Sequence, residues 1–137
     1  MKAITINKDK TLSWSDVSLF PIKDGEITIE VRAVAINRAD LLQREGNYPP
    51  PEGCPDWPGL EVAGIVKEVT PSAKRFNIGD KVCALLGGGG YAEYVNVPEE
   101  MVMPMPKNLS FEEASAIPEV YTTAYLNLFN VGKAKCG

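Results

Sequence analysis

Short stretches in which apolar and polar residues alternate run through most of the chain. The clearest covers residues 26–36, where the odd positions are apolar and Thr28, Glu30 and Arg32 lie on the opposite face, as in a half-buried strand. The same kind of pattern predicts further strands over 2–6, 12–17, 60–69, 81–86, 91–97 and 101–105. Gly64, inside one of these strands, indicates a bulge or the close approach of another backbone.

A capping pattern predicts a short helix directly after the clearest strand. It covers residues 38–45, with Asn37 as its N-cap and Asp40 at the third helical position. Gly46 follows the last turn, where a left-handed conformation usually ends a helix.

Two more helices are predicted near the end of the chain. Ser110 and Glu113 form a capping box that opens the first of them, and Pro118, at a first helical position, begins the second, over 118–131. Many short strands followed by helices predict a mainly β protein. We expect a partly open antiparallel β-barrel with a short helix after the central strand and two C-terminal helices.

Two loops have unusual compositions. Residues 48–58 are rich in proline and predict a stiff, extended segment. The four consecutive glycines at 87–90 lie between two predicted strands. A phosphate-binding loop instead needs Gly-Lys-Ser/Thr at the start of a helix, so a flexible hairpin or crossover is favoured.

The composition narrows the function. The chain has 137 residues, which suits one domain, and a net charge of −4 with its basic residues scattered, whereas a nucleic-acid-binding protein usually carries a basic stripe. No apolar run reaches the roughly 18 residues that cross a membrane, and no signal peptide is evident. We therefore expect a cytoplasmic protein without nucleic-acid or membrane partners.

The chain contains no histidine, which excludes serine–histidine and cysteine–histidine nucleophiles as well as imidazole metal ligands. Its three cysteines, Cys54, Cys83 and Cys136, are widely spaced and form no CxxC pair. They are predicted to be free thiols, and neither a disulfide framework nor a zinc knuckle is expected.

A few polar residues have both structural and functional interpretations. Asn37 either caps the helix with its side-chain amide or faces a cleft from the end of a buried strand. Asp40 and Arg44, four residues apart, either pair with each other or support a site. Tyr48 is either a loop aromatic or a phenol donor held by the prolines after it. Glu61 lies among apolar residues and, if buried, must be paired or neutral.

Several segments, taken in order, resemble the medium-chain dehydrogenase/reductase superfamily. They are Asn-Arg-Ala-Asp-Leu at 37–41, Pro-Gly-Leu-Glu-Val-Ala-Gly at 58–64, Phe-Asn-Ile-Gly-Asp-Lys-Val at 76–82, Gly-Tyr-Ala-Glu-Tyr-Val at 90–95 and Ala-Ile-Pro-Glu at 116–119. Arg-Glu-Gly-Asn-Tyr-Pro at 44–49 and Thr-Ala-Tyr at 123–125 also match. The resemblance implies that residues 1–137 form the GroES-like catalytic domain, with helix 118–131 leading toward a Rossmann domain absent from this chain.

The resemblance points to the zinc-free branch that includes zeta-crystallin and the quinone oxidoreductases. Where zinc alcohol dehydrogenases of the superfamily carry a catalytic cysteine and a histidine, this chain has Asn37 and Leu60. The four-cysteine structural zinc lobe would fall near residues 87–90, which are all glycine. No metal is therefore expected, and residues 37–41 and 85–90 are most similar to the tumour-suppressor-inducible subgroup.

The resemblance further implies hydride transfer from NADPH to a quinone or enone-like acceptor. Asn37 and Thr123 would approach the nicotinamide, and Tyr48 would line the acceptor site and donate to the developing oxyanion. Without the cofactor domain the chain is expected to be inactive alone, and the longer enzyme is expected to be a homodimer. Two alternatives stay open: a GroES-like binding or assembly module without enzymatic activity, and an enoyl or enone reductase of the same superfamily.

Overall fold

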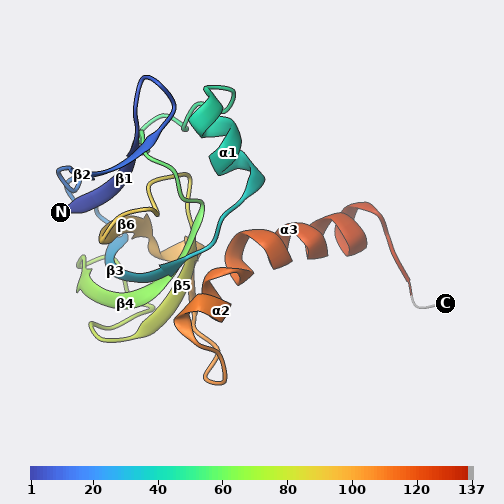
Figure 1. Ribbon diagram of the computed structural model, residues 1–137. Coiled ribbons are helices and arrows are strands. Elements are labelled where there is room, and N and C mark those ends of the chain that lie inside the picture. The colour runs from blue at the N-terminus through green and yellow to red at the C-terminus, as the bar shows by residue number, and fades with distance from the viewer. Residues whose placement is uncertain (136–137) are drawn as a thin grey trace.

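A computed structural model describes residues 1–135 and shows a β-barrel from which a helical segment extends (Figure 1). Two sheets form it: β1 pairs with β2, and five further strands follow the order β6-β3-β4-β5-β7, all antiparallel. The strands are β1 (Lys2–Ile6), β2 (Leu12–Asp16), β3 (Glu26–Val34), β4 (Glu61–Val69), β5 (Lys81–Leu85), β6 (Tyr94–Pro98) and β7 (Val102–Pro104). The prediction of a mainly β, partly open barrel is confirmed.

The barrel interior is built from the alternating positions that the sequence pattern singled out. Ile27 and Ile29 of β3 are fully buried. They belong to one apolar cluster with side chains of β4, β5 and β6. A second cluster lies on the other face of the sheet, where Ala63 and Cys83 pack against Ala114 of α2 (Phe111–Ser115). Burial of these side chains supplies the main driving force for the fold.

Gly64 confirms the predicted close approach within a strand. It pairs with Val31 of β3, and the register shifts between Val31 and Ala33. A β-carbon at position 64 would lie 2.2 Å from the Glu30 carbonyl oxygen. Only glycine fits at this point of the β3–β4 ladder.

The glycines at 87–90 form a packed turn, and the expectation of a flexible loop is wrong. Gly88, Gly89 and Gly90 are buried. A β-carbon at Gly87 would lie 2.6 Å from Cys54 Sγ, and one at Gly89 would lie 2.6 Å from Pro55 Cγ. The run therefore lets the proline-rich loop pack directly against the turn.

The predicted helices are present, and the last is wound differently from the expectation. Helix α1 (Arg38–Glu45) begins after Asn37 and ends at Gly46, which is left-handed with φ 84°. After α2, the chain continues as a π-helix (Ile117–Tyr121), α3 (Thr122–Tyr125) and a second π-helix (Leu126–Val131). Pro118 is the second residue of its helix, where the expectation was the first.

Several strand ends differ from the prediction. The segment expected as strand 91–97 pairs in register with β3 from Tyr94 onward. Before it, Tyr91 and Glu93 bond to the backbone of β1, although the Glu93 carbonyl also accepts from the Val31 N–H of β3. Four other strands are one or two residues shorter than predicted; the predictions were 12–17, 26–36, 60–69 and 81–86. The last strand, β7, is shorter than the predicted 101–105, because a turn of 3-10 helix (Glu99–Met101) precedes it. The alternation of apolar and polar residues within a strand does not indicate which other strand it pairs with.

The thiols of Cys54 and Cys83 are free, as predicted, and Cys136 lies outside the described residues. Burial, assisted by the nearby Glu61 carboxylate, raises the pKa of the Cys83 thiol. No helix in the described range is long and apolar enough to cross a membrane.

Candidate active site

Asn37 lies where β3 passes into α1, and the strand pairing brings it beside Glu61. Val34 near the end of β3 pairs with Val62 of β4, so the first residue of β4 comes close to Asn37. The Asn37 side-chain amide nitrogen donates to Glu61 Oε1 at 2.9 Å. Asn37 is the N-cap residue, as predicted, but this bond shows that its amide nitrogen links two strands.

Glu61 is fully buried and satisfied by two donors. Besides the Asn37 amide, the backbone N–H of Glu119 donates to Glu61 Oε2 at 2.8 Å. Its relative exposure is 0%, so these hydrogen bonds replace the water that a carboxylate would otherwise need. Glu61 therefore ties the end of β3 to the helical segment that follows α2.

A second carboxylate, Glu119, extends this connection to Thr123. The Thr123 hydroxyl donates to Glu119 Oε1 at 3.2 Å. Asn37 and Thr123, 86 positions apart by their numbers, are thus joined through Glu61 and Glu119. We call Asn37, Glu61, Glu119 and Thr123 the carboxylate-linked cluster. The sequence analysis gave Glu119 no role, although it stands in one of the quoted motifs.

Asp40 anchors the start of α1 to two distant loops. Its Oδ2 accepts hydrogen bonds from the Asn37 N–H at 2.7 Å and from the Tyr91 hydroxyl at 3.0 Å. Its Oδ1 accepts from the Gly59 N–H at 2.9 Å. Asp40 is only 4% exposed, and among residues 1–135 no ion pair joins it to Arg44.

Tyr91 is a residue that sequence reasoning missed. Its phenol is half-buried, and its hydrogen bond to Asp40 fixes its direction. Burial, followed by the negative charge of Asp40, raises the pKa of Tyr91 above its ordinary value. In the sequence, Tyr91 stood after the glycine run and inside the quoted motif at 90–95, but it was given no role.

This raised pKa predicts a loss of stability at alkaline pH. Below about pH 10, near the pKa of an unfolded tyrosine, the neutral phenol stabilises the fold. As the pH rises toward the higher pKa of the folded state, the unfolded chain releases the proton first and stability falls. We expect the free energy of unfolding to fall more steeply between about pH 10 and pH 12 in the unmodified chain than in Tyr91→Phe, as measured by urea unfolding. Tyr121→Phe, which removes an exposed phenol, is the matched control, and equal slopes for the two variants would contradict the prediction.

Tyr48 is not joined to the carboxylate-linked cluster. It lies in the loop after α1 with 38% of its surface exposed. In the described part of the chain, no side-chain hydrogen bond links it to Asn37 or Thr123. Its phenol is therefore available to an external acceptor. The structure connects Asn37 and Thr123 through Glu61 and Glu119, and it joins Tyr48 to neither of them.

The donor set does not suit a metal ion. Within residues 1–135, no group of three or more histidine, cysteine, aspartate or glutamate side chains is placed to hold one. A catalytic zinc site needs about three such ligands. The carboxylates of the carboxylate-linked cluster are instead occupied by N–H and O–H donors.

A partly open antiparallel barrel with a short helix after its central strand is the architecture of a GroES-like domain. The profile of the family described as "Alcohol dehydrogenase GroES-like domain" matches residues 23–107. The chain belongs to this family, and the expected membership of the medium-chain dehydrogenase/reductase superfamily is confirmed.

The similar proteins are longer than this chain. The chain is 41% identical over 115 residues to the human protein named synaptic vesicle membrane protein VAT-1 homolog-like. This alignment covers 84% of the chain and 27% of the relative. The crystal structure of human VAT-1 homolog-like protein matches with a TM-score of 0.89 and 36% identity, over 100% of this chain and 45% of that one. The quinone oxidoreductase of Thermus thermophilus, solved also with NADPH, matches with a TM-score of 0.77 and 34% identity, over 100% and 43%. The chain thus spans between about a quarter and a half of the length of these relatives.

Proposed function

We propose that this chain is the substrate-side domain of a zinc-independent oxidoreductase that moves a hydride from NADPH to a quinone or enone-like acceptor. The observation that carries the proposal is the carboxylate-linked cluster, in which hydrogen bonds through Glu61 and Glu119 connect Asn37 to Thr123. Similarity to quinone oxidoreductases supports the choice of acceptor.

The cluster fits the carboxamide of a nicotinamide. Because the Asn37 amide nitrogen already donates to Glu61, the amide oxygen is the group of Asn37 that can accept a hydrogen bond. The Thr123 hydroxyl donates to Glu119, which leaves its oxygen as an acceptor too. A carboxamide NH2 supplies two donors, so these residues would hold and orient the ring.

In this proposal the cofactor supplies the hydride, and the protein binds the acceptor and stabilises its developing charge. Tyr48 is suited to donate a hydrogen bond to the acceptor oxygen, because it is 38% exposed in a loop that is rich in prolines. A preorganised donor of this kind lowers the barrier by stabilising charge that forms in the transition state.

The remaining cofactor contacts would come from a dinucleotide-binding domain after residue 137. Residues 120–135 are exposed throughout, and the helical part of this segment extends from the barrel (Figure 1). Tyr125 and Phe129 stack on it at 4.9 Å between ring centroids, and both are about half exposed or more. An apolar surface of this kind supports packing against a further domain. A cytoplasmic location and a homodimer stay predictions.

The proposal predicts that Tyr48→Phe slows quinone reduction in the protein expressed from its complete reading frame. We expect kcat to fall by about 100-fold, the lower end of the loss when one oxyanion donor is removed, with little change in thermal stability. The assay is NADPH oxidation with 1,4-benzoquinone. Trp14→Phe, at an exposed aromatic on β2, is the matched control.

The same assay separates the alternatives. Turnover of enoyl thioesters without turnover of quinones would favour the enoyl reductase hypothesis. Absence of NADPH oxidation with either substrate class would overturn the proposal and favour a binding module.

A further inference from the structure

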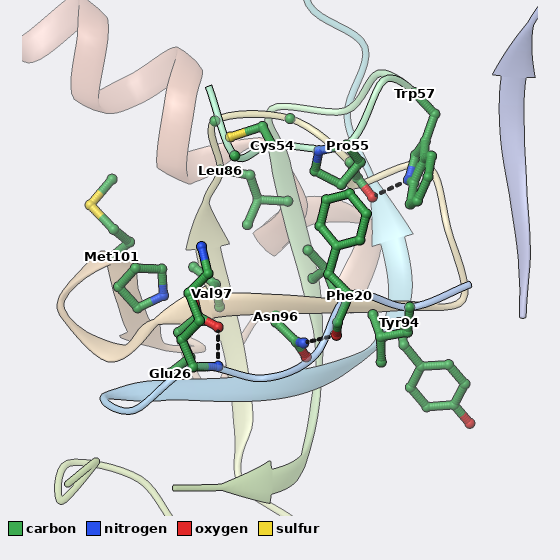
Figure 2. Close-up of a pocket in the computed structure, with 18 of the residues that line it drawn as sticks. Phe20, Glu26, Cys54, Pro55, Trp57, Leu86, Tyr94, Asn96, Val97 and Met101 are labelled. Carbon is green, nitrogen blue, oxygen red and sulfur yellow. Dashed lines mark hydrogen bonds between the residues drawn. The ribbon is translucent and has the colours of Figure 1, made fainter. Parts of the chain in front are cut away.

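A cavity of about 310 Å³ lies on the barrel apart from the carboxylate-linked cluster (Figure 2). Neither Asn37, Tyr48 nor Thr123 lines it. Its walls are mainly apolar and come from four separate segments. The side chains that matter most are Phe20, Trp57, Leu86, Val97 and Met101.

The cavity follows from the openness of the barrel. Strand β6 pairs only with β3, and β7 pairs only with β5, so no ladder joins β6 to β7 within residues 1–135. The cavity lies beside this seam, since residues of β6, the end of β5 and Met101, just before β7, line it. Glycines at 87–89 form one wall, since they let the loop carrying Cys54 and Pro55 approach closely.

Apolar surface inside the cavity is available to a ligand. Leu86 and Val97 form a buried floor, at 7% and 2% exposure. Phe20 and Met101 stay 46% and 40% exposed, and covering them would be favourable at about 25 cal/mol per Å². The Phe20 ring lies next to Trp57, at 6.2 Å between centroids, and points toward Pro55 in Figure 2.

Two polar side chains of the lining, Trp57 and Asn96, are already bonded to the protein. The Trp57 indole N–H donates to the Gly89 carbonyl at 2.8 Å. The Asn96 amide nitrogen donates to the Phe20 carbonyl at 2.7 Å, and its oxygen accepts the Thr28 hydroxyl at 2.7 Å. A polar ligand therefore gains little there.

The charged residues of the lining have opposite signs. Lys23 contributes an ammonium group, and Glu26 and Glu52 contribute carboxylates. Glu26 also accepts a hydrogen bond from the Lys23 backbone N–H at 2.8 Å. With two carboxylates and one ammonium, the lining disfavours an anion, and its apolar walls favour a ligand without a strong charge.

We propose that this cavity is a second binding site, for a neutral and mainly apolar ring compound. Its volume is at the lower end of the range of about 300–1,000 Å³ for small-molecule pockets, which suits a compound of one or two rings. An aromatic ring would stack against Phe20 and Trp57. The site does not depend on the carboxylate-linked cluster or on NADPH.

The test is a titration of the 15N-labelled 137-residue chain with 2-naphthol, followed by two-dimensional NMR. The chain has two tryptophans, and Trp14→Phe assigns their indole signals. We expect a saturable shift of the Trp57 indole N–H and of the Asn96 and Val97 amides. Shifts confined to Asn37 and Tyr48, or to residues 121–129, would overturn the proposal.

Variants of two residues in opposite parts of the lining, Phe20 and Met101, test whether the cavity is the binding site. Phe20→Ala should weaken 2-naphthol binding about tenfold, the loss of one aromatic contact, and Met101→Ala should weaken it through the other wall. Ile78→Ala, which removes an exposed apolar side chain outside the cavity, should bind as the unmodified chain does. Unchanged affinity in both wall variants, with folded spectra, would overturn the proposal. Because no NADPH is present, the outcome is independent of the proposed activity.

Discussion

Replacing Asp40 with alanine is expected to lower the free energy of unfolding by about 4 kcal/mol, from the loss of hydrogen bonds to a buried carboxylate. The side chain accepts from Asn37 N–H, Gly59 N–H and the Tyr91 hydroxyl. Alanine leaves the Gly59 N–H buried without this acceptor, which alone costs about 1–3 kcal/mol. Because small domains are stable by only about 5–15 kcal/mol, the variant should be marginally folded. Urea unfolding followed by circular dichroism measures the change.

The chain provides a matched control with nearly identical local geometry. In the turn at 77–80, Asp80 accepts from the Asn77 N–H at 2.8 Å, and the Asp80 N–H donates to the Asn77 carbonyl at 3.1 Å. Asp40 and Asn37 make the same pair at 2.7 and 3.1 Å. Asp80→Ala should therefore cost only about 1 kcal/mol, the usual loss of a local cap. Equal losses for the two variants would show that the long-range bonds of Asp40 contribute nothing.

Gly64→Ala is expected to destabilise the barrel by about 3 kcal/mol or more, at the upper end for overpacking. The added β-carbon would meet the Glu30 carbonyl oxygen at 2.2 Å and Ile29 Cγ2 at 2.7 Å. The oxygen belongs to the β3–β4 ladder, so it cannot move without breaking strand pairing. The thermal midpoint and the soluble yield should both fall sharply.

Gly25→Ala separates crowding from backbone strain. Gly25 has a φ of +83°, and a β-carbon there meets nothing within 4 Å. Its replacement should cost only the left-handed penalty of about 1–2 kcal/mol. A greater loss at Gly25 than at Gly64 would contradict the close-approach argument.

Elements with a strong local signal were predictable from sequence. The alternation in β3 and the caps at Asn37 and Gly46 depend on neighbouring residues, and the structure confirms them. The start of β6 depends on a competing partner, since the Ile4 N–H donates to the Tyr91 carbonyl and the Glu93 N–H donates to the Lys2 carbonyl. Alternation within 91–97 is the same whichever strand pairs with it.

The candidate site was also predictable only in part from the sequence. The resemblance singled out Asn37 and Thr123, but their connection runs through bonds between residues 24 and 58 positions apart. No local pattern specifies that Glu61 faces both partners. The packing of the glycine turn at 87–90 was missed for the same reason, because the atoms that require glycine belong to Cys54 and Pro55.

The contact between β1 and the segment before β6 has a consequence for synthesis. The Lys2 N–H donates to the Glu93 carboxylate, 91 residues later, and Ala3 pairs with Ala92. Contacts this distant in sequence form late and slow folding. During translation, the first strand therefore emerges from the ribosome long before its partner exists. The β1–β2 hairpin therefore lacks this pairing partner until the segment around Ala92 has left the exit tunnel.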